Sequence, residues 1–364
     1  MLVPALFALA QEQHAGAADI AHAYIVGLEV QAQIGKLVNP EHYESGWHAT
    51  STIGTIGAAA ACAHMLQLDA DGILHAMSVG FSLAGGSKKQ FGSMVKPMHA
   101  GFAAMHGIMA ARLAAAGMKG DQHVMQGRWS FEDLFAGTAS SVAFVPKLFP
   151  AAALAIEEFG LQAKLYPACM SAHLAIDALL ALRGQFDVAD VECIDVHLPA
   201  FMVGNLRYTN PQNEMEARFS VNHCAAVALL YGVPRLAHFS VEAVARAEVQ
   251  ALLPLVRMHV REPFVKRTDL PWGGDCHVSV TLKSHRVYSE CTTYPKGCNK
   301  NPLTESEQRE KFLDCARLAL GLDGAVELYG CLADFLYLEQ ITPITDRLRP
   351  RAIGSCPPSE HSAT

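Results

Sequence analysis

Helical spacing of apolar side chains over the first 118 residues constrains the fold more than any other feature. Ala, Leu, Ile and Met recur every three to four residues, glycines mark the breaks, and almost nothing alternates as a strand would. We expect helices over 18–34 and 55–67, and a third that Asp69 caps and that runs through Leu83. This pattern predicts a packed helical bundle.

The pattern changes after Ala155, where helical and strand-like segments mix. Val191 to Leu198 alternates between apolar and polar residues, as a half-buried strand does. The other expected elements are helices from Pro167 to near Arg183, over 220–231 and over 241–252, and strands within 255–261 and 276–289. Together these segments predict an α+β domain.

The C-terminal part is expected to be helical again. Thr304 and Glu307 form a capping-box pattern that opens a helix to about Leu320, and a further helical stretch covers 323–338. Because 364 residues exceed one typical domain, more than one is expected. We predict a helical domain over 1–156, an α+β domain over 157–302, and a return of 303–364 to the helical domain, ending in a loose tail.

Composition and charge exclude several classes of protein. The net charge is -7 and no basic run exists, so no nucleic-acid partner is expected. No apolar run reaches about 18 residues, so no membrane span is expected. Ten cysteines without a CxxC pair fit a reducing cytoplasm, and a signal peptide is not expected because no Lys or Arg precedes Lys36.

Two segments place basic side chains beside expected helix starts. His48 precedes the 55–67 helix, whose electropositive end favours a carboxylate that the imidazole could protonate or deprotonate. Lys96 and His99 flank Pro97, which we place at a first helical position, followed by a helix from Met98 to about Ala116, so both side chains can face one ligand. The alternatives are packed histidines with satisfied hydrogen bonds and a solvated lysine.

Lys164 repeats this arrangement ahead of Pro167, with His173 on the second turn of the expected helix. A solvated Lys164 and a His173 paired with Asp177 are the alternatives. Lysines and histidines without clustered carboxylates suit an anionic substrate better than a metal, and HExxH, Walker, GxGxxG and GxSxG motifs are absent. We therefore expect no metal and no cofactor, and we assign Lys88 to a loop on the substrate side.

These stretches together resemble the MmgE/PrpD family, which includes 2-methylcitrate dehydratase, cis-aconitate decarboxylase and iminodisuccinate epimerase. The matching segments are Gly46–Thr50, Phe91–Gly101, Lys164–Cys169, Ala217–Ser220 and Pro295–Leu303. The resemblance implies an all-helical domain with an α+β lid, a homodimer, and an active site in the cleft between the domains. It also implies His48, Lys96 and Lys164 as catalytic positions, with His99 beside them.

The chain departs from the family pattern in two respects. Members usually carry about a hundred further N-terminal residues, so we expect the apolar residues Leu2, Val3, Leu6 and Phe7 to be exposed or covered by a partner. His223 occupies a position where relatives often have tyrosine, and Tyr208 is another candidate in the lid. We list Thr50, Lys88, Tyr208 and His223 as expected substrate-binding residues.

The resemblance implies a lyase that acts on a small di- or tricarboxylate by proton transfer α to a carboxylate, either as a dehydratase or as a decarboxylase. Two alternatives remain open. The chain could be an epimerase of the iminodisuccinate type, or an inactive or weakly active fragment that only binds polycarboxylates.

Overall fold

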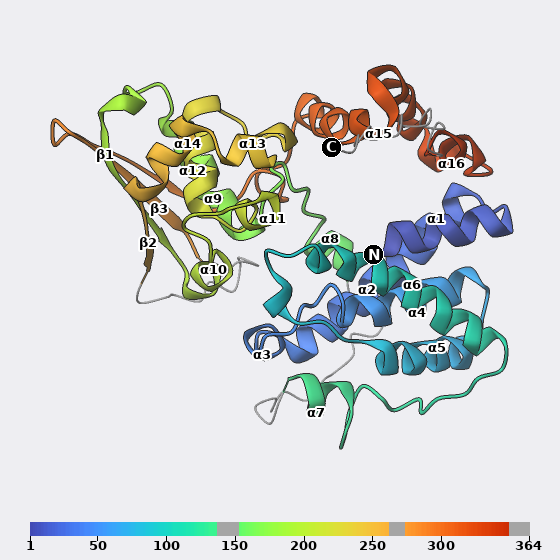
Figure 1. The fold of residues 1–364 in the computed structure, drawn as a ribbon. Coiled ribbons are helices and arrows are strands. Elements are labelled where there is room, and N and C mark those ends of the chain that lie inside the picture. Colours follow the sequence, from blue (N-terminus) through green and yellow to red (C-terminus); the bar gives the residue numbers. More distant parts are fainter. Residues whose placement is uncertain (137–152, 262–273, 349–364) are drawn as a thin grey trace, which may run out of the picture.

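The computed structural model describes residues 1–136, 153–261 and 274–348. A helical part and a part built around a small sheet lie next to each other (Figure 1). The α+β fold class expected from the sequence is confirmed, with an all-helical N-terminal region and a sheet further along the chain. Within the described residues, no helix is both long enough and apolar enough to cross a membrane.

The helical part is organised around a buried central helix, α4. Its small residues allow close packing: a Cβ added at Gly57 would lie 2.8 Å from the carbonyl oxygen of Gly27, and one at Gly107 would lie 2.5 Å from the Ala58 side chain. Asp69 caps α5 as expected, accepting a hydrogen bond from Gly72 N–H at 2.9 Å. The helices are α1 (Leu2–Gln13), α2 (Ala17–Val38), α3 (Glu41–Glu44), α4 (Ile53–Met65), α5 (Ala70–Leu83), α6 (Val95–Ala115) and α7 (Phe131–Phe135).

The sheet has four strands in the order β2-β1-β3-β4, with β1 and β2 parallel and the other neighbours antiparallel. The expected strand at Val191–Leu198 is confirmed as β1, and β2 is Val256–Val260. The segment 276–289, expected as one strand, instead forms β3 (Cys276–Leu282) and the start of β4 (Val287–Thr292), because the chain turns at Lys283 to Arg286.

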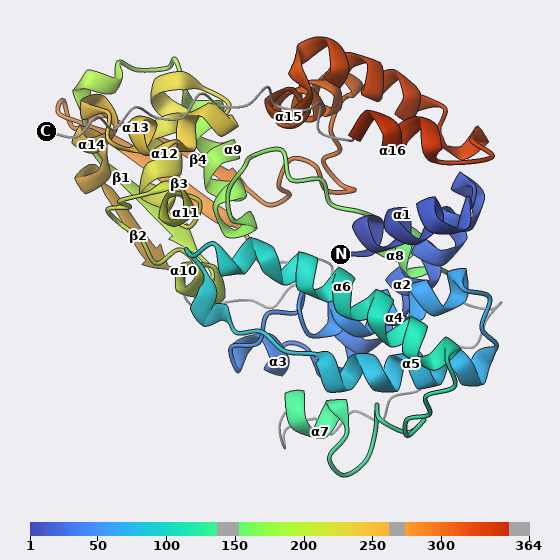
Figure 2. The same ribbon diagram turned by 45° about the vertical axis from the view of Figure 1, so that its right-hand side comes forward.

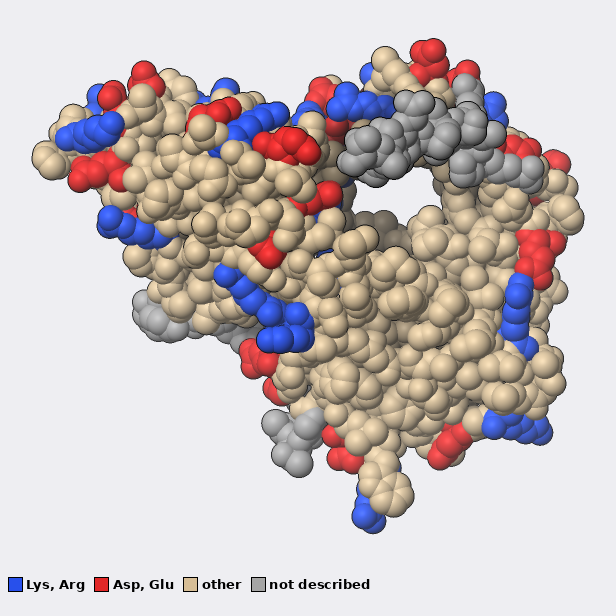
Figure 3. Space-filling view, in the orientation of Figure 1, with Lys and Arg blue, Asp and Glu red and all other residues tan. Residues whose placement is uncertain are grey.

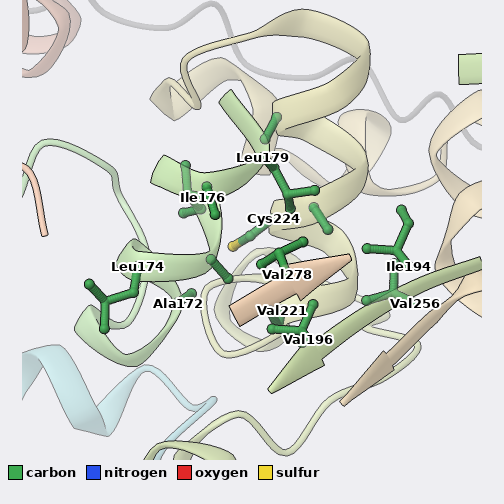
Figure 4. Packing of buried hydrophobic residues seen from close by; sticks show 14 of the residues in the cluster. Ala172, Leu174, Ile176, Leu179, Ile194, Val196, Val221, Cys224, Val256 and Val278 are labelled. Atoms are coloured by element: carbon green, nitrogen blue, oxygen red, sulfur yellow. The ribbon is translucent and has the colours of Figure 1, made fainter. Parts of the chain in front are cut away.

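Helices α9 and α12 cover one face of this sheet. Figure 4 shows Leu179 and Cys224 from these helices packed toward Val196 and Val278 of the strands. The helices of this part are α8 (Ala155–Glu158), α9 (His173–Leu182), α10 (Ala200–Asn205), α11 (Glu214–Ala217), α12 (Val221–Tyr231), α13 (Val241–Val244) and α14 (Ala247–Leu252). The expected helix 241–252 is thus broken into two.

The C-terminal helices α15 (Glu305–Ala333) and α16 (Thr342–Leu348) return toward the helical part (Figure 2). The Thr304–Glu307 capping box is confirmed, and α15 is kinked at Gly321, whose φ is 71°. The expectation that the apolar face of α1 is uncovered is wrong for Leu2 and Leu6, which are 4% and 0% exposed. Phe7 stacks on Phe335 at 5.9 Å, so this chain's own C-terminal segment covers part of α1.

Candidate active site

Two buried histidines, His48 and His99, form a direct hydrogen-bonded pair. Their Nδ1 atoms are 2.8 Å apart, and the side chains come from segments 51 residues apart in the sequence. They are 7% and 4% exposed. One Nδ1 must donate and the other must accept, so at least one of the two imidazoles is neutral.

The segment around His48 is held by a short antiparallel contact. His48 N–H donates to the Gly86 carbonyl at 3.0 Å, beside the bridge between Trp47 and Ser87. Gly86 has a φ of 138°, and a Cβ there would lie 2.7 Å from the Ser51 Cβ and 3.3 Å from the His99 ring. A glycine at this position therefore lets the backbone approach the histidine pair.

Helix α6 supplies His99 and Lys96, but it begins earlier than expected. It starts at Val95, so Pro97 is its third residue and His99 its fifth, in the second turn and not the first. Pro97 is tolerated because the first four N–H groups of a helix have no intrahelical partner. Burial, followed by the charge of Lys96, lowers the pKa of His99.

Several cations surround the pair. Burial is the largest cause that lowers the pKa of His48 to about 3, and neighbouring charges add to it. In order of effect, these neighbours are Lys96, the partner imidazole of His99, Lys164 and Lys88. Burial, then Lys164, also lowers the pKa of Lys96. Figure 3 shows Lys and Arg side chains gathered at the surface where the two parts of the molecule meet.

The cations near the pair are poorly neutralised. Within the described ranges neither Lys96 nor Lys164 has a carboxylate ion-pair partner. Arg218 raises the positive charge near Lys96, and although Arg218 pairs with Glu214, its buried Nε has no hydrogen-bond partner among the residues described. Unpaired, partly desolvated cations of this kind favour an anionic ligand.

Aromatic rings form part of the wall, a feature that the sequence analysis missed. The Phe91 ring meets His48 edge-on at 5.2 Å and lies 5.0 Å from Phe219. Lys96 Nζ is 5.8 Å and 5.6 Å from these two rings. Phe91 belongs to the helical part and Phe219 to the α+β part. Both lie in segments that resemble the family, Phe91–Gly101 and Ala217–Ser220, and this resemblance is the sequence signal that could have identified them.

Lys164 lies near the pair, but not at a helix start. The chain bends at 166–168, a single 3-10 turn covers Met170–Ala172, and α9 begins at His173, so the expected helix from Pro167 starts later than predicted. The suggested pairing of His173 with Asp177 is also absent, because Asp177 accepts from Tyr166 at 2.5 Å and from Lys296 N–H at 2.8 Å.

The expected substrate-binding residues fall in different surroundings. Thr50 lies in the turn between His48 and α4. Lys88 Nζ donates a hydrogen bond to the Tyr43 carbonyl at 3.1 Å and lies 3.7 Å from the centre of the Tyr43 ring. The Tyr208 hydroxyl donates to the Phe91 carbonyl at 3.1 Å and rests against Gly92, joining the two parts of the chain beside the pair.

His223, another expected substrate-binding residue, makes its contacts inside the α+β part. It is 0% exposed, its Nε2 is 3.0 Å from the His238 carbonyl, and its ring meets Phe239 at 5.1 Å. These contacts hold it within the α+β part and do not bring it to His48.

The neutral pair can supply an acid and a base together. If one imidazole donates through Nδ1–H, its Nε2 carries a free lone pair; the acceptor imidazole then carries its proton on Nε2. One Nε2 can therefore remove a proton while the other delivers one, and the Nδ1–Nδ1 hydrogen bond links the two. Surrounding ammonium groups stabilise negative charge that develops on a bound substrate.

Family models identify the class of protein to which this fold belongs. The model of the MmgE/PrpD N-terminal domain matches residues 1–142, and that of the C-terminal domain matches residues 166–327. The chain belongs to the MmgE/PrpD family.

Curated relatives include several cis-aconitate decarboxylases. The human protein of that name is 28% identical over 365 aligned residues, which cover 95% of this chain and 73% of the relative. The mouse protein is 27% identical, covering 91% and 68%. The Aspergillus terreus protein is 25% identical, covering 96% and 75%.

Buried neutral histidines predict acid-sensitive stability. Burial is the main cause that lowers the pKa of His42 and His223 to about 4, and that of His48 and His173 to about 3. The unfolded chain takes up protons near pH 6.5 whereas the native state does not, so stability is lost as the pH falls from about 6.5 toward 3. Each histidine contributes at most about 1.4 kcal/mol per pH unit.

Urea unfolding between pH 7.5 and 5 measures this effect. We expect the free energy of unfolding to fall with pH, and to fall less steeply in the variant His223→Gln, which removes one buried imidazole. Equal stability across this range, or an unchanged slope in a folded His223→Gln protein, contradicts the assignment.

Proposed function

We propose that the protein is a lyase that decarboxylates an unsaturated tricarboxylate of the cis-aconitate type. The observation that carries this proposal is the neutral His48–His99 pair near Lys96 and Lys164, two lysines without a carboxylate partner in the described part of the chain. The names of the curated relatives favour decarboxylation over dehydration or epimerisation. The proposal applies those names to this chain by similarity.

In the proposed reaction, Lys96 and Lys164 bind carboxylates and orient the substrate. Breaking the carbon–carbon bond to the departing carboxylate releases carbon dioxide and leaves an electron pair delocalised over the adjacent double bond. The ammonium groups stabilise this negative charge. An imidazole Nε2–H of the pair then protonates carbon, which gives an unsaturated dicarboxylate, and solvent restores the proton.

The test is to incubate the protein with cis-aconitate, 2-methylcitrate and iminodisuccinate and to follow carbon dioxide release and product formation by proton NMR. Titration calorimetry with the same ligands accompanies it. We expect carbon dioxide and an unsaturated dicarboxylate from cis-aconitate. Binding without turnover favours a protein that only binds polycarboxylates, whereas inversion of iminodisuccinate alone favours an epimerase.

We predict that turnover does not change when chelator is added. Lys88, Lys96 and Lys164 add positive charge around the histidine pair, and a divalent cation placed there would be repelled. The measurement compares initial rates before and after dialysis against EDTA. A rate that falls and is restored by a divalent metal would contradict the proposed mechanism.

A further inference from the structure

The face of the sheet opposite the helices carries a row of histidines, one from each of three neighbouring strands. His197 on β1 pairs in register with His259 on β2 and with His277 on β3. Cys291 on β4 continues the row opposite His277. Paired residues point to the same side of a sheet, so these side chains share one face. The alternate positions, such as Val196, are buried under the helices.

The central ring, His197, lies close to the histidine rings on both neighbouring strands. The His197 and His259 rings are 4.7 Å apart between centroids, with an interplanar angle of 21°, and the His197 and His277 rings are 6.1 Å apart. Two imidazole nitrogens on one zinc ion, each at about 2.0–2.1 Å, are roughly 3.4 Å apart in tetrahedral geometry. Rotation of the His197 ring about χ2 can turn one of its nitrogens toward the His259 ring without any change in the backbone.

A carboxylate orients one of these rings. His259 Nε2 is 2.6 Å from Asp195 Oδ1, on the same sheet face two residues before His197. When the carboxylate accepts the Nε2–H hydrogen bond, Nδ1 of His259 is left with a free lone pair. Metal-binding histidines commonly make this contact between their other ring N–H and a carboxylate.

We propose that this histidine row binds one divalent transition-metal ion of the zinc, nickel or copper class. The ligands are His197 and Nδ1 of His259. No group of three or more such side chains is arranged to hold an ion within the described residues, so water completes the coordination. Imidazole ligands select these metals over magnesium and calcium.

Metal bound here stabilises the folded protein, because the ion joins β1 to β2 and binds only when the strands are paired. The row and the His48–His99 pair share no residue, so this site is independent of the proposed lyase activity. Metal occupancy is expected to raise the thermal midpoint without being required for turnover.

The test is titration calorimetry of tag-free, metal-stripped protein with zinc chloride and nickel chloride, with magnesium chloride as the selectivity control. We expect one saturable site for zinc and nickel, none for magnesium, and a thermal midpoint that rises with metal. Asp195→Asn is expected to weaken binding by about 10- to 100-fold, the usual effect of losing an outer-shell partner. His197→Gln is expected to weaken it at least as much.

His123→Gln is the matched control, since His123 is highly exposed in the helical part. It is expected to bind like the wild type. Circular dichroism verifies that each variant is folded, and the two variants remove the site in different ways. Absence of saturable zinc and nickel binding by the wild type, or unchanged affinity in folded His197→Gln, overturns the proposal.

Discussion

Replacing Lys96 by alanine is expected to lower kcat/KM for the carboxylate substrate by about 100- to 1000-fold, the range seen when a group that stabilises developing negative charge is removed. The stability of the fold is not expected to decrease. Burial and the nearby charge of Lys164 lower the pKa of Lys96, which means that its charged form is disfavoured in the free protein. The thermal midpoint of Lys96→Ala is therefore expected to equal or slightly exceed that of the wild type.

Lys89→Ala is the matched control, because Lys89 is an exposed lysine on the segment that leads into the same helix. It should retain wild-type kinetics. The measurements are steady-state kinetics and thermal unfolding of the wild type, Lys96→Ala and Lys89→Ala. Wild-type kcat/KM in a folded Lys96→Ala protein would remove Lys96 from the site, and a large drop in its midpoint would make Lys96 a structural residue.

Replacing His48 by alanine is expected to lower kcat by about two to four orders of magnitude, the range for losing a positioned acid or base with part of its hydrogen-bond network. The change also leaves His99 Nδ1 without its buried partner, which costs about 1–3 kcal/mol of stability. His48→Asn separates the two effects, since the amide can hydrogen-bond near the former Nδ1 position but cannot transfer a proton. We expect it to recover stability but not turnover.

His22→Ala is the control for losing an imidazole, because His22 is exposed on α2. Substrate affinity, measured by calorimetry, should change less than kcat in both His48 variants. If affinity falls while kcat of the bound complex is unchanged, His48 anchors the substrate and does not carry the proton. Recovery of turnover in His48→Asn would exclude proton transfer through this ring.

Local sequence predicted what depends on local physics. The period of apolar residues identified α2, α4 and α5, and the cap residues Asp69 and Thr304 fixed helix starts that the structure confirms. Alternation identified β1. The same reasoning failed at 276–289, because a period of two continues through a tight hairpin without a glycine or proline at the turn.

The site was predictable only in part. Its basic residues stand in recognisable motifs, but the Nδ1–Nδ1 contact joins His48 to His99 across 51 residues and depends on how α4 and α6 pack. Gly86 lets the backbone approach the histidine pair. This role is visible only in the structure, from the short distances between a Cβ at this position and Ser51 and His99. The wall formed by Phe91 and Phe219 likewise requires the two parts of the chain to be in contact.

Proton NMR of the reaction with cis-aconitate in deuterium oxide tests the central claim most directly. If the histidine pair protonates carbon after carbon dioxide leaves, the unsaturated dicarboxylate product contains one solvent-derived deuterium on carbon, and its rate of formation falls by about two to four orders of magnitude in His48→Ala. Unchanged cis-aconitate in the presence of folded wild-type protein, or a product that carries no deuterium, would contradict the account.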